Sequence, residues 1–330
     1  MAKLAAYTLE GQSLRLIISF LLGIAVVIAL LLNFDLGAVM AAVKHGGIAG
    51  FLLIVGAGLA VEVVLAIGIW PLLLSPVPLP IIVAARQLRD SSSDVLPITQ
   101  IGGVAFAARA LVLYGMAASE ASAVVIADFT TEAFAQGLYV FAGVLASLSL
   151  LYASPALSPY VTAMLGGALF ISFGSIGFAL VQLGGGKWVD RMADKLFGSD
   201  LTRARTFHEI IHAIYGRHKR VALSILLQLA GWFASGFWLW VILRTMGFHA
   251  DIRAALAIQA LLEGLRSATV FIPASVGIQE AGYAVLAPVF GFTPEIGLAV
   301  SLLRRARDLV VAMPVLLIWQ LIEGRRAYRA

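Results

Sequence analysis

The chain has 330 residues, of which 61% are hydrophobic and only 12% are charged. A soluble globular domain carries about 25% charged residues, so the composition excludes that class and indicates a polytopic α-helical membrane protein. The chain has no cysteine, which excludes disulfides, thiolate chemistry and cysteine-based metal sites, and its net charge of +5 is modest.

Apolar segments of about twenty residues, the length that crosses a bilayer as a helix, recur along the chain. The first apolar run begins at Leu16 and is long enough to span, so we expect it to stay as an anchor rather than to be removed as a signal peptide. Six segments are predicted to span the membrane: Leu14–Leu32, Ile48–Trp70, Val124–Leu151, Tyr160–Leu183, Val221–Leu243 and Glu295–Ile322.

Two further apolar regions fit a simple span poorly. Leu96–Ala118 is broken early by Pro97 and by Gly102-Gly103, and Ile252–Phe290 is too long for one crossing and too short for two. Backbone that leaves helical pairing inside a bilayer is tolerated where protein or a water-filled cavity satisfies it. Both regions are therefore predicted to be re-entrant hairpins.

Lys and Arg concentrate in the loop 184–220 and in the C-terminal tail, and positive residues in short loops favour the cytoplasm. If 96–118 is a hairpin entered from inside, a cytoplasmic N-terminus puts the loop 184–220, the C-terminal tail, Arg86 and Arg89 all on the cytoplasmic side. If 96–118 is a full span, the N-terminus lies outside. We prefer the hairpin, which places both chain ends in the cytoplasm.

The predicted elements repeat along the chain. Residues 1–155 form a first membrane half with the hairpin 96–118, and residues 156–330 form a second half with the cytoplasmic loop 184–220 and the hairpin 252–290. Broken elements at corresponding positions of inverted halves indicate the midplane binding site of a transporter. The predicted fold class is all-α: a polytopic integral membrane protein of two inverted-topology halves, each with three spans and one re-entrant hairpin.

The second hairpin contains a helix break at Pro273 and Gly277, directly followed by the polar residues Gln279 and Glu280. A broken helix that carries a carboxylate and an amide at membrane depth favours a site over an interfacial loop. Glu280 could face a cationic headgroup, bind a coupling proton, or pair with Arg266 or Arg109. The glycines of both breaks are expected to act through geometry, by allowing sharp turns or close approach.

The last predicted span carries Arg304, Arg305, Arg307 and Asp308 near its middle. A charge at the centre of a membrane helix costs about 2.5–3.5 kcal/mol, so these residues need a cavity or partners. Arg304 and Asp308 are spaced i, i+4 and are predicted to pair, which leaves Arg305 and Arg307 to bind a phosphate. The alternative is a salt-bridge network that only fixes helix packing. Glu62, inside the second span, is as consistent with a structural role as with a functional one.

The stretch His208-Glu209-Ile210-Ile211-His212 matches the H-E-x-x-H motif, in which two histidines bind zinc and the glutamate activates water. Its surroundings predict an amphipathic helix with the histidines at the border of the apolar face, which suits a helix lying on the anionic cytoplasmic leaflet. No third ligand stands nearby in the sequence. We therefore prefer the interfacial helix to the metalloprotease.

Several of these stretches also carry a resemblance. In chain order they are Leu96-Pro97-Ile98-Thr99-Gln100-Ile101-Gly102-Gly103 with Ala108-Arg109, Asp128-Phe129-Thr130-Thr131-Glu132, Pro273-Ala274-Ser275-Val276-Gly277-Ile278-Gln279-Glu280, and Leu302-Leu303-Arg304-Arg305-Ala306-Arg307-Asp308-Leu309 with Trp319-Gln320. Together they resemble the transmembrane region of lysylphosphatidylglycerol synthases and flippases, and are most similar to the hopanoid-associated, HpnL-like membrane proteins. Relatives often carry an acidic residue where this chain has Val104, so a proton or cation role there is in doubt.

The resemblance implies a lipid-translocation module without an aminoacyl-transfer domain. We expect a non-enzymatic flippase-like protein of a bacterial-type cytoplasmic membrane that moves a hopanoid or a phospholipid between leaflets, without cofactor or metal. The alternatives are a membrane-associated zinc metalloprotease and a non-transporting partner of lipid-biosynthetic enzymes. The expected lipid-binding residues are Glu62, Gln100, Gly102, Gly103, Arg109, Pro273, Gly277, Gln279, Glu280, Arg304, Arg305, Arg307 and Asp308.

Overall fold

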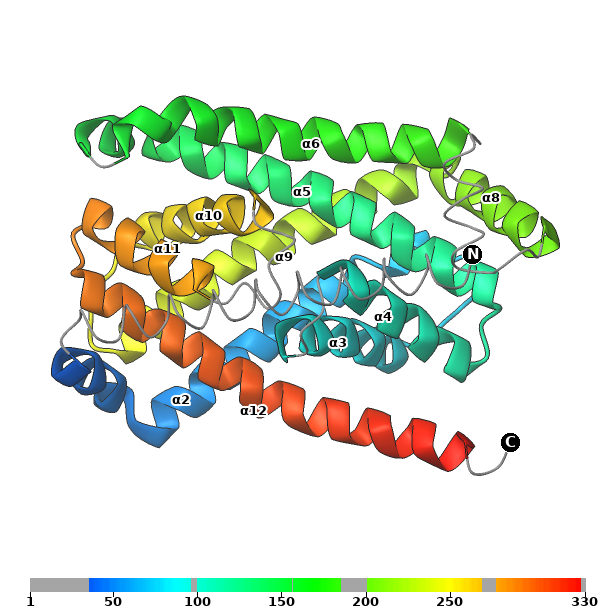
Figure 1. Cartoon of the computed structure of the whole chain (residues 1–330), viewed down its shortest axis with the longest axis horizontal. Coiled ribbons are helices and arrows are strands. Elements are labelled where there is room, and N and C mark those ends of the chain that lie inside the picture. The colour runs from blue at the N-terminus through cyan, green and yellow to red at the C-terminus, as the bar shows by residue number, and fades with distance from the viewer. Residues whose placement is uncertain (1–35, 96–99, 156, 185–200, 269–276, 328–330) are drawn as a thin grey trace, which may run out of the picture.

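A computed structural model describes residues 36–95, 100–155, 157–184, 201–268 and 277–327 of the chain (Figure 1). The described residues are helical, without a strand. The α-helices are α2 (Leu36–Ile67), α3 (Leu79–Val95), α4 (Gln100–Tyr114), α5 (Ala118–Ala153), α6 (Val161–Gly184), α8 (Leu201–Tyr215), α9 (His218–Thr245), α10 (Ile252–Ala268), α11 (Ile278–Leu286) and α12 (Pro294–Ala327). Short 3-10 turns lie at η1 (Trp70–Leu72), η2 (Ser158–Tyr160) and η4 (Ala287–Phe290).

Four helical stretches within the described residues are long and apolar enough to cross a membrane: Lys44–Leu72, Ala118–Ala153, Met164–Leu183 and His218–Thr245. They coincide with four of the six predicted spans. The predicted span Leu14–Leu32 lies outside the described residues. The sixth prediction corresponds to α12, a continuous helix of 34 residues that is not one of the four, because charged residues interrupt its apolar sequence.

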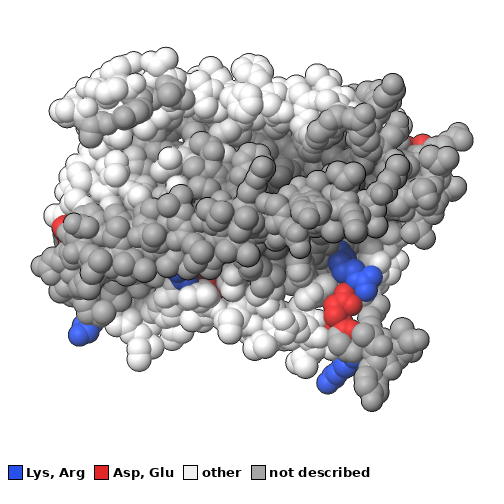
Figure 2. Space-filling view, viewed as in Figure 1, with Lys and Arg blue, Asp and Glu red and all other residues white. Residues whose placement is uncertain are grey.

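Long helices dominate the arrangement, and α5, α6 and α12 run along the long axis of the molecule (Figure 1). Helix α9 crosses between them and packs against α2 and α5. Most of the described surface in Figure 2 is uncharged, and the outward side of α6 exposes large apolar residues such as Phe170 and Phe173. An uncharged, apolar outer face is what contact with lipid requires.

The first hairpin differs from its prediction. Helices α3 and α4 pack against each other, so the helical pair begins at Leu79 rather than at residue 96. The prediction that Arg86 and Arg89 belong to a cytoplasmic loop is wrong, because both side chains are buried on α3, at 3% and 8% exposure. The physical reason is that carboxylates from α5 neutralise them, which hydropathy along the chain does not register.

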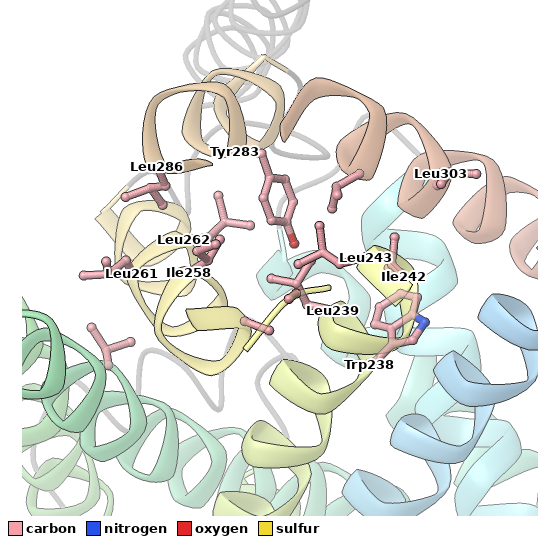
Figure 3. Packing of buried hydrophobic residues seen from close by; sticks show 14 of the residues in the cluster. Trp238, Leu239, Ile242, Leu243, Ile258, Leu261, Leu262, Tyr283, Leu286 and Leu303 are labelled. Atoms are coloured by element: carbon pink, nitrogen blue, oxygen red, sulfur yellow. The ribbon is translucent and has the colours of Figure 1, made fainter. Parts of the chain in front are cut away.

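The second hairpin consists of α10, α11 and η4, which pack together within the predicted range 252–290. Its tip, including Pro273, lies outside the described residues. Helix α11 begins after Gly277, whose φ of 83° is in the left-handed region that favours glycine. Side chains from α9, α10, α11 and α12 converge around Tyr283 in the larger hydrophobic cluster (Figure 3).

Candidate functional site: a charged cavity between the hairpins

The helices enclose a cavity of about 280 Å³ that is lined by residues of α2, α3, α5, α6, α9, α10, α11 and α12. Its lining contains six carboxylates and five guanidinium groups, which is a high density of charge for the interior of a membrane protein. These residues are Glu62, Arg86, Arg89, Asp90, Asp94, Glu132, Glu263, Arg266, Arg304, Arg307 and Asp308.

One wall of the cavity is an ion-pair network between α3 and α5. Arg86 donates both terminal nitrogens to the Glu132 carboxylate, at 2.5 and 3.0 Å. Arg89 donates to Glu132 at 2.7 Å and to Asp128 at 3.3 Å, and both arginines also contact Asp90. Bidentate arginine–carboxylate pairs are the strongest ion pairs in proteins, so this wall is firmly held.

The opposite wall joins α10, α11 and α12. Arg304 donates through Nη1 to Gln259 Oε1 and to the Tyr283 hydroxyl, both at 2.5 Å. Its guanidinium also lies 4.3 Å from the centroid of the Trp238 ring, a cation–π distance. The prediction that Arg304 pairs with Asp308 is therefore wrong. Arg304 points towards α10 and α11, where a neutral amide oxygen and a phenol oxygen accept its hydrogen bonds.

Glu263 on α10 continues this wall. Its carboxylate accepts from Gln259 at 2.8 Å, from Arg266 at 3.3 Å and from Gln136 of α5 at 3.3 Å. Glu263 and Arg266 are spaced i, i+3, so they pair across one turn of α10. The bond to Gln136 ties the second hairpin to α5, so both walls share that helix.

Arg307 lies between the two walls, and its side chain is 4% exposed. Its Nη1 is 3.1 Å from Asp308 Oδ1 and 3.8 Å from Glu62 Oε1, while Nε and Nη2 have no hydrogen-bond partner. The guanidinium is held between the Trp238 ring, 5.0 Å away, and the backbone at Gly58, where a Cβ would lie 2.7 Å from Nε. The structure thus keeps a strongly desolvated cation with unused donors inside the cavity.

The first turn of α11 lies beside the cavity. Gln279 lines the cavity and donates to Ser301 at 3.2 Å. Glu280 does not line it: one oxygen accepts from the backbone N–H of Gly277 at 2.9 Å, and the other from Arg305 at 2.8 Å. Glu280 therefore caps α11 and pairs with Arg305, rather than with Arg266 or Arg109.

Other residues expected at the site lie elsewhere. Arg109 is 51% exposed and pairs with Glu323 at 2.7 Å, so it links α4 to α12 away from the cavity. Gly103 is buried against α3, where a Cβ would lie 2.5 Å from the Arg89 carbonyl oxygen. This close approach is the geometric role that the sequence suggests for the Gly-Gly pair. Gln100 begins α4, and Pro273 lies outside the described residues.

The sequence-based site list lacks most of the cavity's charged residues. The lining residues of α3 fall at spacing i, i+3, i+4, i+7 and i+8, which is a polar face of one helix. Asp128 and Glu132 are i, i+4 within an apolar helix, another signal of paired intramembrane charge. These signals could have located the α3–α5 wall. The missed lining residues are Arg86, Arg89, Asp90, Asp94, Glu132, Gln259, Glu263 and Arg266.

The H-E-x-x-H stretch lies on α8, which contributes no residue to the cavity lining. His208 Nε2 and His212 Nε2 are 3.1 Å apart, and His212 Nε2 is 2.9 Å from the carbonyl oxygen of Leu183. Among the described residues no group of three metal-ligating side chains occurs. The apolar face of α8 packs on protein, with Phe207 and Ile211 buried in the cluster that includes α5, so the expectation that this face rests on lipid is wrong.

Comparison with known proteins agrees with this architecture. The family described as lysylphosphatidylglycerol synthase TM region matches the chain over residues 15–315, which include every residue of the cavity lining. No curated protein and no solved structure matches the chain. The chain is a helical, multi-pass membrane protein tied to lipid handling, and it belongs to the lysylphosphatidylglycerol synthase TM region family.

Proposed function

We propose that the protein is a flippase-like transporter that moves an amphiphilic lipid, a hopanoid or a phospholipid, between the leaflets of a bacterial-type cytoplasmic membrane. The observation that carries this proposal is the cavity of about 280 Å³, which brings charged groups from both halves of the chain together. A polar chamber enclosed by apolar helices can receive a headgroup while the lipid tails stay in the bilayer.

The arrangement of the helices supports two inverted halves. The order α2, α3–α4, α5 recurs as α9, α10–α11, α12, and each half places a helical pair before a long helix. The halves also exchange contacts, because α10 packs against α5 and α3 packs against α12. The pair α3–α4 and the pair α10–α11 lie towards opposite ends of the long axis (Figure 1). Two re-entrant pairs that meet at a shared cavity are typical of alternating-access transporters.

The orientation follows from the basic residues. Helix α8, which belongs to the Lys/Arg-rich stretch 184–220, and the end of α12 lie towards the same end of the molecule (Figure 1). Positive residues in short loops and tails favour the cytoplasm. We therefore place that end, and both chain ends, on the cytoplasmic side, with the α9–α10 turn on the opposite side.

Reconstitution tests the proposed function. Purified protein in vesicles, with fluorescent lipids labelled on the acyl chain, should move the probe between leaflets faster than protein-free vesicles. The double variant Arg304→Gln/Arg307→Gln should lose this movement, because it removes the unpaired donors and the cation that the Trp238 ring holds. Arg109→Gln, at an exposed pair outside the cavity, is the control and should keep it. Equal movement by the double variant and the wild type would refute the proposal.

A further inference from the structure

Most charges that line the cavity are matched within the protein, but Arg307 is not fully matched. Its side chain is 4% exposed, and Nε and Nη2 make no hydrogen bond. The Glu62 carboxylate, 3.8 Å from Nη1, is near without being hydrogen-bonded to it. A guanidinium removed from water loses several kcal/mol of hydration unless its donors are used, so Nη2 is a donor that an added anion would satisfy.

Asp94 is a charged lining residue without a direct partner in the described part of the chain, whereas Glu62, whose Oε2 also makes no hydrogen bond, lies beside Arg307. It lies on α3 and lines the cavity half-buried, and the described residues offer its carboxylate neither a hydrogen bond nor an ion pair. The charged groups that face it are Asp308, Arg266, Asp90 and Arg305. Both arginines are already engaged, Arg266 with Glu263 at 3.3 Å and Arg305 with Glu280 at 2.8 Å. Asp94 therefore lines the cavity without a direct partner among the described residues.

Arg307 and Asp94 line the same cavity as Asp308, whose Oδ1 is 3.1 Å from Arg307 Nη1. We propose that the cavity selects a zwitterionic headgroup, with its anionic group at Arg307 and its cationic group between Asp94 and Asp308. This inference rests on the proposed function and names the class of lipid that it would move.

Charge matching separates the candidate headgroups. A singly anionic headgroup uses the free donors of Arg307 and leaves Asp94 without a partner. A singly cationic headgroup does the reverse. A headgroup that carries phosphate and ammonium together satisfies both, and the lining of six carboxylates and five arginines gives no large excess field that would favour either sign alone.

Binding is measured first, on the purified full chain, with water-soluble headgroups. Isothermal titration calorimetry should give glycerophosphoethanolamine an affinity at least about tenfold above that of glycerophosphoglycerol, a factor equivalent to about 1.4 kcal/mol. Asp94→Asn should reduce this preference to about threefold or less. Arg307→Gln should weaken both headgroups. Asp251→Asn, the same change at an exposed residue that caps α10, is the matched control and should leave the preference intact.

Translocation is measured next, with acyl-labelled phosphoethanolamine and phosphoglycerol lipids in vesicles that contain the same variants. Faster movement of the zwitterionic lipid, with the difference lost in Asp94→Asn, supports the inference. If both lipids move at equal rates and Arg307→Gln abolishes the movement of both, the transport function stands and the preference for a zwitterionic headgroup is overturned. A binding preference without movement of either lipid would keep the zwitterion site and overturn the transport function. Thermal melting of each variant checks that it is folded, and glycerophosphoglycerol binding as tightly as glycerophosphoethanolamine would overturn the inference outright.

Discussion

At the scale of the residue, the protein offsets the cost of intramembrane charge by pairing. Glu132 accepts from both Arg86 and Arg89, so one carboxylate holds two buried cations. The Arg109–Glu323 pair is chemically similar but exposed, at 51% and 30%. The environments therefore predict different energies for the same kind of contact, because removing one partner of a buried pair leaves an uncompensated charge.

Glu132→Gln should lower the free energy of unfolding by about 3–5 kcal/mol, since it removes the charge that accepts from both buried arginines and leaves them to Asp90 and Asp128. Glu323→Gln, the same chemical change at the exposed pair, should cost at most about 1 kcal/mol. Denaturation of the two variants in the same detergent measures the difference. Equal stabilities would mean that the α3–α5 network is far more hydrated than its burial indicates.

Gly58→Ala should displace the Arg307 side chain, because a Cβ at Gly58 would lie 2.7 Å from Nε and 2.9 Å from an atom of the Trp238 ring. Overpacking of this kind costs about 1–3 kcal/mol, and lipid movement should fall with the displaced guanidinium. Gly56→Ala is the control on the same helix, because nothing lies within 4 Å of its Cβ position. Thermal melting and the vesicle assay together test the pair; Gly58→Ala with wild-type melting and transport contradicts the role given to this glycine.

At the scale of the element, helices α3 and α10 have corresponding places. Each has 17 residues, precedes a short helix and contributes charged side chains to the cavity. Their chemistry differs, because α3 presents two arginines to acids of α5, whereas α10 presents the neutral amide of Gln259 to Arg304 of α12 and pairs Glu263 with its own Arg266. The α3 wall is thus held by ion pairs between helices, and the α10 wall meets α12 through a neutral acceptor.

Helix α8 yields a test of the zinc motif. The variant His208→Ala/His212→Ala should leave lipid movement unchanged, because these side chains contact each other and Leu183 rather than the cavity lining. Purified wild type should hold no stoichiometric zinc by elemental analysis. One zinc per chain, lost in the double variant, would instead favour the metalloprotease.

At the scale of the whole molecule, the proposed orientation predicts which sites are accessible from each side. The chain has no cysteine, so a thiol reagent can label only the single cysteine that is introduced. Ala2→Cys and Arg205→Cys should resist an impermeant reagent added outside cells, because basic residues hold those regions in the cytoplasm. Asp251→Cys, in the α9–α10 turn, should react. Outside labelling at position 2 or 205 would overturn the orientation.

The sequence by itself determined the class and the main helices of this protein. Hydropathy is a local property of about twenty residues, so it identified α2, α5, α6 and α9 as spans and the helix breakers near residues 97 and 273. The charges of α12 were also apparent, because a charge within an apolar stretch is conspicuous. The expectation of a midplane binding site followed from the helix breakers.

Only the tertiary structure decided how the charges are matched. From the local sequence, Arg86 and Arg89 look like loop residues. Their partner Glu132 lies on α5, 46 and 43 positions further along the chain. Arg304 has an acid at i+4, yet it donates its hydrogen bonds to Gln259 and Tyr283 on other helices. A charge's free energy depends on everything within a few ångströms, and most of those neighbours are distant in sequence. The unused donors of Arg307 and the unpartnered carboxylate of Asp94 are therefore visible only after the helices have packed.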